Sequence, residues 1–454
     1  MRRLPDLSAL ARRRPVVASA AALALTAGVA RLFDASYRMV VARLVGPETV
    51  GLLQMAGSVY SFALGLATLG LAPALARLVA ARRAEEPAVT TARLLAMPAG
   101  IGSALLLLAA APWLAGRALP DPRVLRPLQI LAFGLIPAAY CATLRGQLQG
   151  TQRMAPLAWS QVVEPLVRLT LVSLLLAGAS SLWSVPLPLP PAALLAIAGV
   201  VAEGVECLFL HTWLTRAARG ARRPKAPSPA PAFSPPVARE LLRLAVPLMI
   251  SQFVFSTVAM LDAGLVPRLL AASGLSAPEA TRQYGMLYGM VLPFLFFPMT
   301  LIFPITAVLI PAVAEAREAG RHGLVRKRIG LAVRATLLVE AGAALVYLLW
   351  PHRLAALVGG GSEVTALIRG LLLWVPFAYL DHTGVSALIG LGNTRAALVD
   401  GLLNSAVRLG VSCLLVPVPG FGVRGALVAL AAGDAVATFA HFLRLAPLRR
   451  RPAR

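Results

Sequence analysis

Residues 16–45 read VVASAAALALTAGVARLFDASYRMVVARLV, and residues 16–30 of this stretch carry no charge. A mainly apolar run of about 20 residues crosses a bilayer as a helix. Comparable runs follow near residues 50–80, 94–115, 124–148, 155–178, 192–215, 241–270, 284–314, 329–350, 366–391, 396–416 and 423–443. With 58% hydrophobic and 14% charged residues, the chain is predicted to be an all-α integral membrane protein with about twelve transmembrane helices.

The basic residues are unevenly divided between the segments that join the predicted spans. A formal charge of +24 would suggest nucleic-acid binding in a soluble chain. Here Arg and Lys gather in alternate segments, at residues 2–14, 77–83, 216–225, 321–328 and 449–451. The positive-inside rule therefore predicts that both termini are cytoplasmic. A secretory signal at the N-terminus is the less favoured alternative, because the first apolar run continues into charged residues without a small-residue cleavage site.

The chain divides into two similar halves of six predicted spans. Residues 217–238 are rich in proline and arginine and are predicted to form a cytoplasmic linker between a lobe at 1–216 and a lobe at 239–454. Short sequences recur in the same order, such as Val50-Gly-Leu-Leu53 and Tyr284-Gly-Met-Leu287. Two halves of equal orientation predict a pseudo-twofold axis along the membrane normal.

The first span carries three ionisable residues on one helical face. Arg31, Asp34 and Arg38 are spaced three and four apart. A charge at membrane depth costs ~2.5–3.5 kcal/mol, so these side chains should face protein or water. Arg31 and Asp34 could neutralise each other as a structural pair, or the face could bind a ligand. Arg38 is expected to lack a partner within this helix.

Other charged residues inside spans are interpreted mainly as structure. Glu164 and Arg168 lie four apart, and Asp400, Asn404 and Arg408 share one stripe, so internal ion pairs, or a secondary cavity, are favoured over a substrate site. Asp262 lies one position from the repeat counterpart of Arg38 and could form a gate with it. Prolines in the span at 284–314 predict a bend there, and these are Pro293, Pro298, Pro304 and Pro311.

Enzyme and cofactor signatures are weak. All three cysteines, Cys141, Cys207 and Cys413, fall inside predicted spans with no CxxC pair, so no disulfide, metal or cofactor is expected. Asp381 and His382 are adjacent but have no identifiable third partner, so a polar contact is favoured over catalysis. The sequence therefore indicates that the protein is not an enzyme.

The chain resembles the stage V sporulation protein B group of polysaccharide and lipid-linked oligosaccharide flippases along nearly its whole length. The stretches that carry the resemblance include 37–47 (YRMVVARLVGP), 51–55 (GLLQM), 149–154 (QGTQRM), 284–290 (YGMLYGM) and 416–423 (VPVPGFGV). The resemblance implies membership of the multidrug, oligosaccharidyl-lipid and polysaccharide exporter superfamily. It also implies two lobes that alternate in access and a bacterial cytoplasmic membrane.

Relatives that move the lipid-linked peptidoglycan precursor use arginines in a central cavity to hold a lipid diphosphate. Arg31 and Arg38 match that pattern by position, with Arg43 near the outer end of the span. Asp34 departs from it, because the resemblance leads us to expect a small residue there, usually glycine. This carboxylate could lower the positive field or couple a cation. The residues expected to bind substrate are Arg31, Asp34, Arg38, Arg43, Gln54 and Asp262.

The resemblance therefore favours a flippase for an undecaprenyl-diphosphate-linked sugar, a precursor of cell wall, spore cortex or polysaccharide, with membrane lipids as its surroundings. A cation-coupled multidrug exporter that uses Asp34, or Glu203 and Glu206, is the alternative. An exporter of cationic drugs should have a net acidic cavity, whereas the first span carries more arginine than acid. A membrane-bound sugar transferase ranks last, because the acidic residues outside the predicted spans are dispersed.

Overall fold

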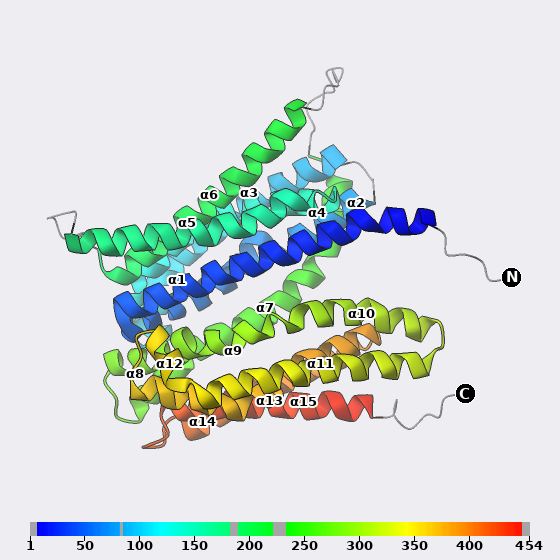
Figure 1. Cartoon of the computed structure of the whole chain (residues 1–454). Helices are drawn as coiled ribbons and strands as arrows, with labels where there is room; N and C mark the ends of the chain where they lie inside the picture. Colours follow the sequence, from blue (N-terminus) through cyan, green and yellow to red (C-terminus); the bar gives the residue numbers. More distant parts are fainter. Residues whose placement is uncertain (1–6, 82–84, 182–188, 221–232, 447–454) are drawn as a thin grey trace. The chain divides into compact units, whose positions relative to one another are not determined.

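The computed structural model describes residues 7–81, 85–181, 189–220 and 233–446, and within them the regular structure is entirely helical (Figure 1). Most of the predicted linker, residues 221–232, lies outside the described residues. The N-terminal helices are α1 (Leu7–Thr68), α2 (Leu71–Ala80), α3 (Glu85–Trp113), η1 (Leu114–Ala118), η2 (Pro122–Val124), α4 (Leu125–Gly150), α5 (Met154–Ser181) and α6 (Pro191–Gly220). The C-terminal helices are α7 (Pro235–Ala272), α8 (Ala277–Tyr284), η3 (Gly285–Val291), α9 (Leu292–Met299), α10 (Ile302–Glu318), α11 (His322–Leu349), α12 (Pro351–Leu357), α13 (Ser362–Gly390), α14 (Thr394–Leu415) and α15 (Val423–Leu445).

Helix α1 contains the first predicted span and most of the second. Gly46 has φ 75° and ψ 171°, which kinks the helix between the spans predicted at 16–45 and 50–80. The apolar segment Gly28–Ala80 has 53 residues, and at 1.5 Å per residue it is about 80 Å long, more than twice the ~30 Å hydrocarbon thickness. The segment is too long for a single crossing of the bilayer, so it provides two spans.

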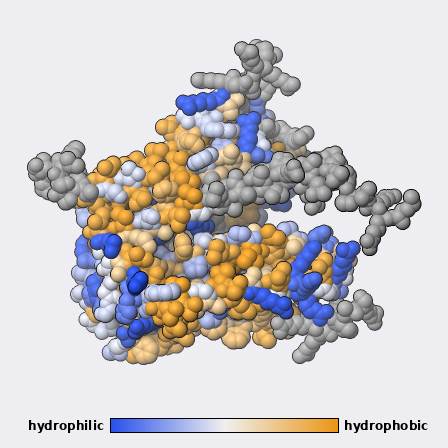
Figure 2. Space-filling view, in the orientation of Figure 1, coloured by the Kyte–Doolittle hydropathy of each residue, from blue (hydrophilic) through white to orange (hydrophobic). Residues whose placement is uncertain are grey.

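Within the described residues, nine helices are long and apolar enough to cross a membrane, or up to ten if one bent pair counts as a span. Large apolar side chains face outward, among them Leu338, Leu414 and Leu443, each more than 70% exposed. Figure 2 shows hydrophobic residues over much of the visible face. Exposed leucine on this scale is typical of a surface solvated by lipid, and the prediction of an all-α membrane protein is confirmed.

The bend predicted from prolines is present. Ala277–Met299 and Ile302–Glu318 meet at 49°, directly after Pro298. The first of these segments also widens into a π-helix, η3, along Gly285–Val291. Proline removes a helix hydrogen bond and π-bulges loosen the backbone, so both features account for a broken span.

The chain forms two compact units whose boundaries cut through helices. One unit contains residues 1–40 and 55–261, and the other contains residues 41–54 and 262–454. Helices α1 and α7 therefore each contribute to both units. In the first unit α4 packs on α2, α3 and α6. In the second unit α13 packs on α10, α11 and α15, and α14 packs on α15.

Two glycines at matching places of the sequence repeat meet in the second unit. A Cβ placed on Gly285 would lie 1.9 Å from the carbonyl oxygen of Pro47 and 2.6 Å from the amide nitrogen of Gly51. A Cβ placed on Gly51 would lie 2.3 Å from the carbonyl oxygen of Thr281. Two backbones can approach this closely only where both residues are glycine. The part of α1 after its kink and η3 therefore cross without intervening side chains.

Candidate functional site

Asp34 joins α1 to α5 in the first unit. Its Oδ2 accepts a hydrogen bond from Nε of Arg38 at 3.1 Å, and its Oδ1 accepts one from Nη2 of Arg168 at 2.8 Å. The expectation that Arg38 lacks a partner in its own helix is therefore wrong, because residues four apart meet on one face and Asp34 is its partner. Of the predicted substrate-binding residues, Asp34 and Arg38 are in direct contact.

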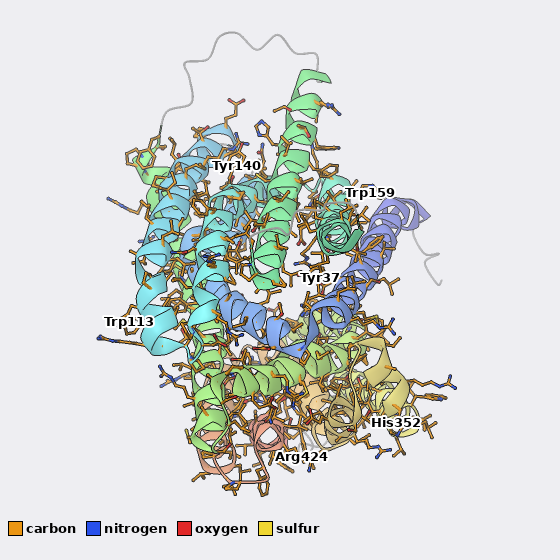
Figure 3. The ribbon with its side chains drawn as sticks, turned by 90° about the vertical axis from the view of Figure 1, so that its left-hand side faces the viewer. Tyr37, Trp113, Tyr140, Trp159, His352 and Arg424 are labelled. Carbon is orange, nitrogen blue, oxygen red and sulfur yellow. The ribbon has the colours of Figure 1, made fainter. Side chains whose placement is uncertain are left out.

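Arg168 is the central cation of this group. Its Nη1 lies 3.3 Å from Glu164 Oε1, one turn earlier on α5, as the sequence predicts for an internal ion pair. Its guanidinium carbon also lies 4.6 Å from the ring centroid of Tyr37, a buried residue of α1 that Figure 3 labels. A guanidinium held by two carboxylates and an aromatic face has a fixed orientation. This packing anchors α1 on α5.

The α1 face keeps an excess of positive charge and remains accessible. The side chains of Asp34 and Arg38 are 36% and 44% exposed, and Arg31, one turn before Asp34, is exposed. Arg38 uses Nε for Asp34, so its terminal nitrogens make no hydrogen bond among the described residues. Arg38 and Arg168 contact the two carboxylates, Asp34 and Glu164. With Arg31, the group carries three cations and two anions, so an anion would meet a net positive charge.

A second charged group in the first unit links α4 to α6. Arg145 donates to Glu206 through both Nε, at 3.2 Å, and Nη2, and the Glu206 side chain is almost fully buried. Glu203, one turn earlier on α6, accepts a hydrogen bond from the Tyr60 hydroxyl at 2.6 Å. Sequence reasoning named both glutamates but overlooked Arg145, although a single arginine inside an apolar span was a usable signal. Glu206 is thus a neutralised structural group.

The predicted residues of the second unit have partners on other helices. Asp262, which is 3% exposed, pairs with Arg408 of α14 at 2.6 Å. Asp400 accepts bidentate hydrogen bonds from Arg444 of α15, at 2.9–3.1 Å. The expectation that Asp400 and Arg408 neutralise each other along α14 is therefore wrong. Both are ion-paired, but these pairs fasten α14 to α7 and α15.

His441, which the sequence analysis did not single out, lies at the centre of the second-unit network. His441 is fully buried on α15, with Nδ1 2.9 Å from Asp400 Oδ2 and Nε2 3.1 Å from Asp381 Oδ1. The contact with Asp381 is within ion-pair distance, but neither of its two atoms makes a hydrogen bond among the described residues. Asp434 of α15 accepts hydrogen bonds from Asn404 at 2.7 Å and from the Trp374 indole at 2.5 Å. These contacts join α13, α14 and α15, and they give Asp381 the polar contact predicted for it.

The other predicted substrate-binding residues lie after the α1 kink or near it, in the second unit. Arg43 is exposed and passes beside Gly359, whose Cβ, if present, would lie 3.2 Å from the Arg43 Cα atom. Gln54 is half-buried. In the part of the chain that the structure describes, no group of three His, Cys, Asp or Glu side chains has a geometry suited to a metal ion.

Comparison with known proteins places the chain in a family. The family profile described as "Polysaccharide biosynthesis protein" matches residues 16–317. The chain belongs to this family. The sequence is 27% identical over 419 residues to stage V sporulation protein B of Bacillus subtilis, covering 91% of this chain and 80% of that protein. It is 24% identical over 318 residues to sporulation protein YkvU of the same organism, covering 69% of this chain and 68% of that protein. The resemblance expected from the sequence motifs is confirmed.

Solved structures with the same fold are transporters of the MOP superfamily. An inward-facing MATE multidrug resistance transporter matches with a TM-score of 0.76 at 14% identity, covering 93% of this chain and 96% of that one. A Pyrococcus furiosus transporter, described as having a binding pocket of reversed polarity that suggests a different function, matches with a TM-score of 0.65 at 16% identity, covering 95% and 96%. These identities establish the fold. The comparisons agree with the prediction of a membrane transporter rather than an enzyme.

Proposed function

We propose that this member of the polysaccharide biosynthesis family is a flippase that moves an undecaprenyl-diphosphate-linked sugar across the bacterial cytoplasmic membrane by alternating access. The observation that carries the proposal is the accessible, net positive face of α1, formed by Arg31 and Arg38 and continued by Arg168 on α5. Both chain termini lie in the cytoplasm in this proposal, in keeping with the sorting of Arg and Lys.

The chemistry of these side chains suits a diphosphate. A planar guanidinium donates two parallel hydrogen bonds to a phosphate and stays charged at every physiological pH. Because Arg38 contacts Asp34 through Nε alone, its terminal nitrogens remain for the ligand. The prenyl tail needs no protein cavity, since it stays in lipid while the charged headgroup is carried across.

A cation-coupled multidrug exporter is the second candidate, and one observation favours it. Glu203 accepts its described hydrogen bond from a neutral group, the Tyr60 hydroxyl, so among the acids named for this alternative it is the best placed for a coupling ion. The other two acids that could couple an ion in such an exporter are already ion-paired. Asp34 is paired with Arg38 and Arg168, and Glu206 is paired with Arg145. A cationic drug would therefore meet arginine first on α1.

The test is transport by the purified protein in liposomes that contain a fluorescent lipid-diphosphate sugar, with a cationic dye offered in parallel. The double variant Arg31→Ala/Arg38→Ala should lose most lipid-diphosphate transport. Each lost charge-assisted hydrogen bond is worth ~1.5–3 kcal/mol, about ten- to a hundred-fold in affinity.

The matched control is Arg321→Ala/Arg395→Ala, which removes two exposed arginines of the second unit and should transport normally. Protein yield and thermal unfolding must be compared in both variants, since an unbalanced Asp34 also perturbs the bundle. Normal transport by a well-folded Arg31→Ala/Arg38→Ala protein would overturn the proposed site. Transport of the dye alone would favour the exporter.

A further inference from the structure

A trough in the second unit combines basic and apolar walls. It has a volume of about 650 Å³ and lies between the N-terminal half of α11 and the end of α15. Arg326, Lys327 and Arg334 line it from α11, while Phe442 and Leu445 line it from α15. Both helices pack on α13, and the trough opens between them. Figure 2 shows hydrophilic residues gathered where Figure 1 has the turn from α10 to α11.

The sequence of α11 builds this wall as a single stripe. Arg326, Gly330 and Arg334 are spaced by four residues and therefore lie on one face. A Cβ on Gly330 would meet nothing within 4 Å, so the missing side chain hollows the stripe between the two arginines. Eight residues at 1.5 Å per residue place the two arginines about 12 Å apart along the helix axis.

Two cations of the trough, Lys327 and Arg334, have no acidic partner among the described residues. Arg334 and Lys327 are exposed, and neither makes an ion pair or hydrogen bond with any other described residue. The described residues that line the trough include no carboxylate. Arg334 belongs to the apolar span His322–Leu349. Only 22% of the most apolar stretch of this span is buried inside the protein. An arginine on a lipid-facing span is costly unless an anion or water meets it.

We propose that this trough binds an anionic glycerophospholipid, with the phosphate between Lys327 and Arg334 and an acyl chain along Phe442 and Leu445. The basic wall complements the headgroup and the apolar wall complements the chain, a combination used by lipid sites between transmembrane helices. The inference is independent of the transported substrate. The chain's own residues 447–454 contain four arginines and no acid, so their charge does not complement the trough.

Native mass spectrometry of the full chain, with phosphatidylglycerol, phosphatidylcholine or undecaprenyl phosphate as added lipid, tests the site. The variant Lys327→Gln/Arg334→Gln should bind phosphatidylglycerol roughly thirty-fold more weakly, from the ordinary contribution of two basic side chains to anionic lipid binding. Gly330→Leu keeps both charges but fills the hollow, and it should also reduce retention of phosphatidylglycerol. Phosphatidylcholine should bind weakly to every form.

Two controls are matched to these variants. Arg321→Gln/Arg395→Gln removes two exposed charges outside the trough, and Gly342→Leu adds the same side chain to α11 at a position where a Cβ also meets nothing within 4 Å. Both should retain phosphatidylglycerol. Equal retention by wild type and both trough variants would overturn the proposal. So would binding of phosphatidylcholine as tight as that of phosphatidylglycerol, or preferential displacement by undecaprenyl phosphate, which would assign the trough to a prenyl lipid.

Discussion

Replacing Asp34 by asparagine separates its structural role from an ion-coupling role. The carboxylate accepts from Arg38 at 3.1 Å and from Arg168 at 2.8 Å. Asparagine keeps the shape and one acceptor oxygen but removes the charge. The group formed by Arg31, Arg38, Arg168, Asp34 and Glu164 then changes from one net positive charge to two. We expect lower stability together with tighter diphosphate binding.

Both effects are modest in size. The Arg38 pair is about half exposed and contributes about 0.3–0.5 kcal/mol, as exposed pairs four residues apart do. The Arg168 contact is less exposed and contributes about 1 kcal/mol after allowance for solvent. For a chain of 454 residues, the total corresponds to a fall in Tm of about 1–2 °C. For binding, a unit charge about 7 Å from the phosphate at an effective dielectric of about 60 is worth about 0.8 kcal/mol, or roughly four-fold.

The assay is binding of undecaprenyl diphosphate to the purified protein, at low salt and again at high salt, with liposome transport measured in parallel. The gain in affinity should shrink at high salt, because partly exposed charges are screened. Glu315→Gln removes a carboxylate that pairs with Arg328 in the second unit, and it should leave binding unchanged. A folded Asp34→Asn protein with normal binding and no transport would refute this reasoning and identify Asp34 as an essential coupling site.

Two further predictions concern the fold and its orientation. Gly285→Ala should lower the free energy of unfolding by about 1–3 kcal/mol, because the added Cβ would meet the backbone of Pro47 and Gly51. The control Gly342→Ala should be neutral or stabilising. Equal melting temperatures of the two variants would contradict the close crossing of α1 and η3. In a variant without the three native cysteines, His322→Cys should react with an impermeant thiol reagent only from the cytoplasm and Ser362→Cys only from outside, and the reverse result would invert the orientation.

The helices were predictable because their signal is local. An apolar run of sufficient length identifies a span without knowledge of its neighbours, and the glycine at position 46 coincides with the boundary expected between the first two spans. The bend in the span at 284–314 was also predictable from its prolines, since each proline removes a hydrogen bond from its own helix. The π-helix at Gly285–Val291 was not predicted.

The partners of charged residues were less predictable, because they depend on which helices become neighbours. Spacing along α14 suggested that Asp400 and Arg408 neutralise each other, but Arg444 and Asp262 are their partners. His441 was not singled out from the sequence, and in the structure it lies between two carboxylates. By contrast, Glu164 and Arg168 are one turn apart on the same helix, and there the local rule sufficed.

The balance of charge distinguishes the α1 face from the buried groups. Asp262, Glu206 and Asp400 are almost fully buried, and each has a guanidinium within ion-pair distance. Buried charges need such partners, because a charge without an ion-pair partner in a low-dielectric interior costs several kcal/mol. On α1 the cations outnumber the acid and are exposed, so they can exchange solvent for a ligand without breaking a buried pair. An anion gains more than a cation at such a place, and this is the reason we propose a lipid diphosphate rather than a cationic drug as the substrate.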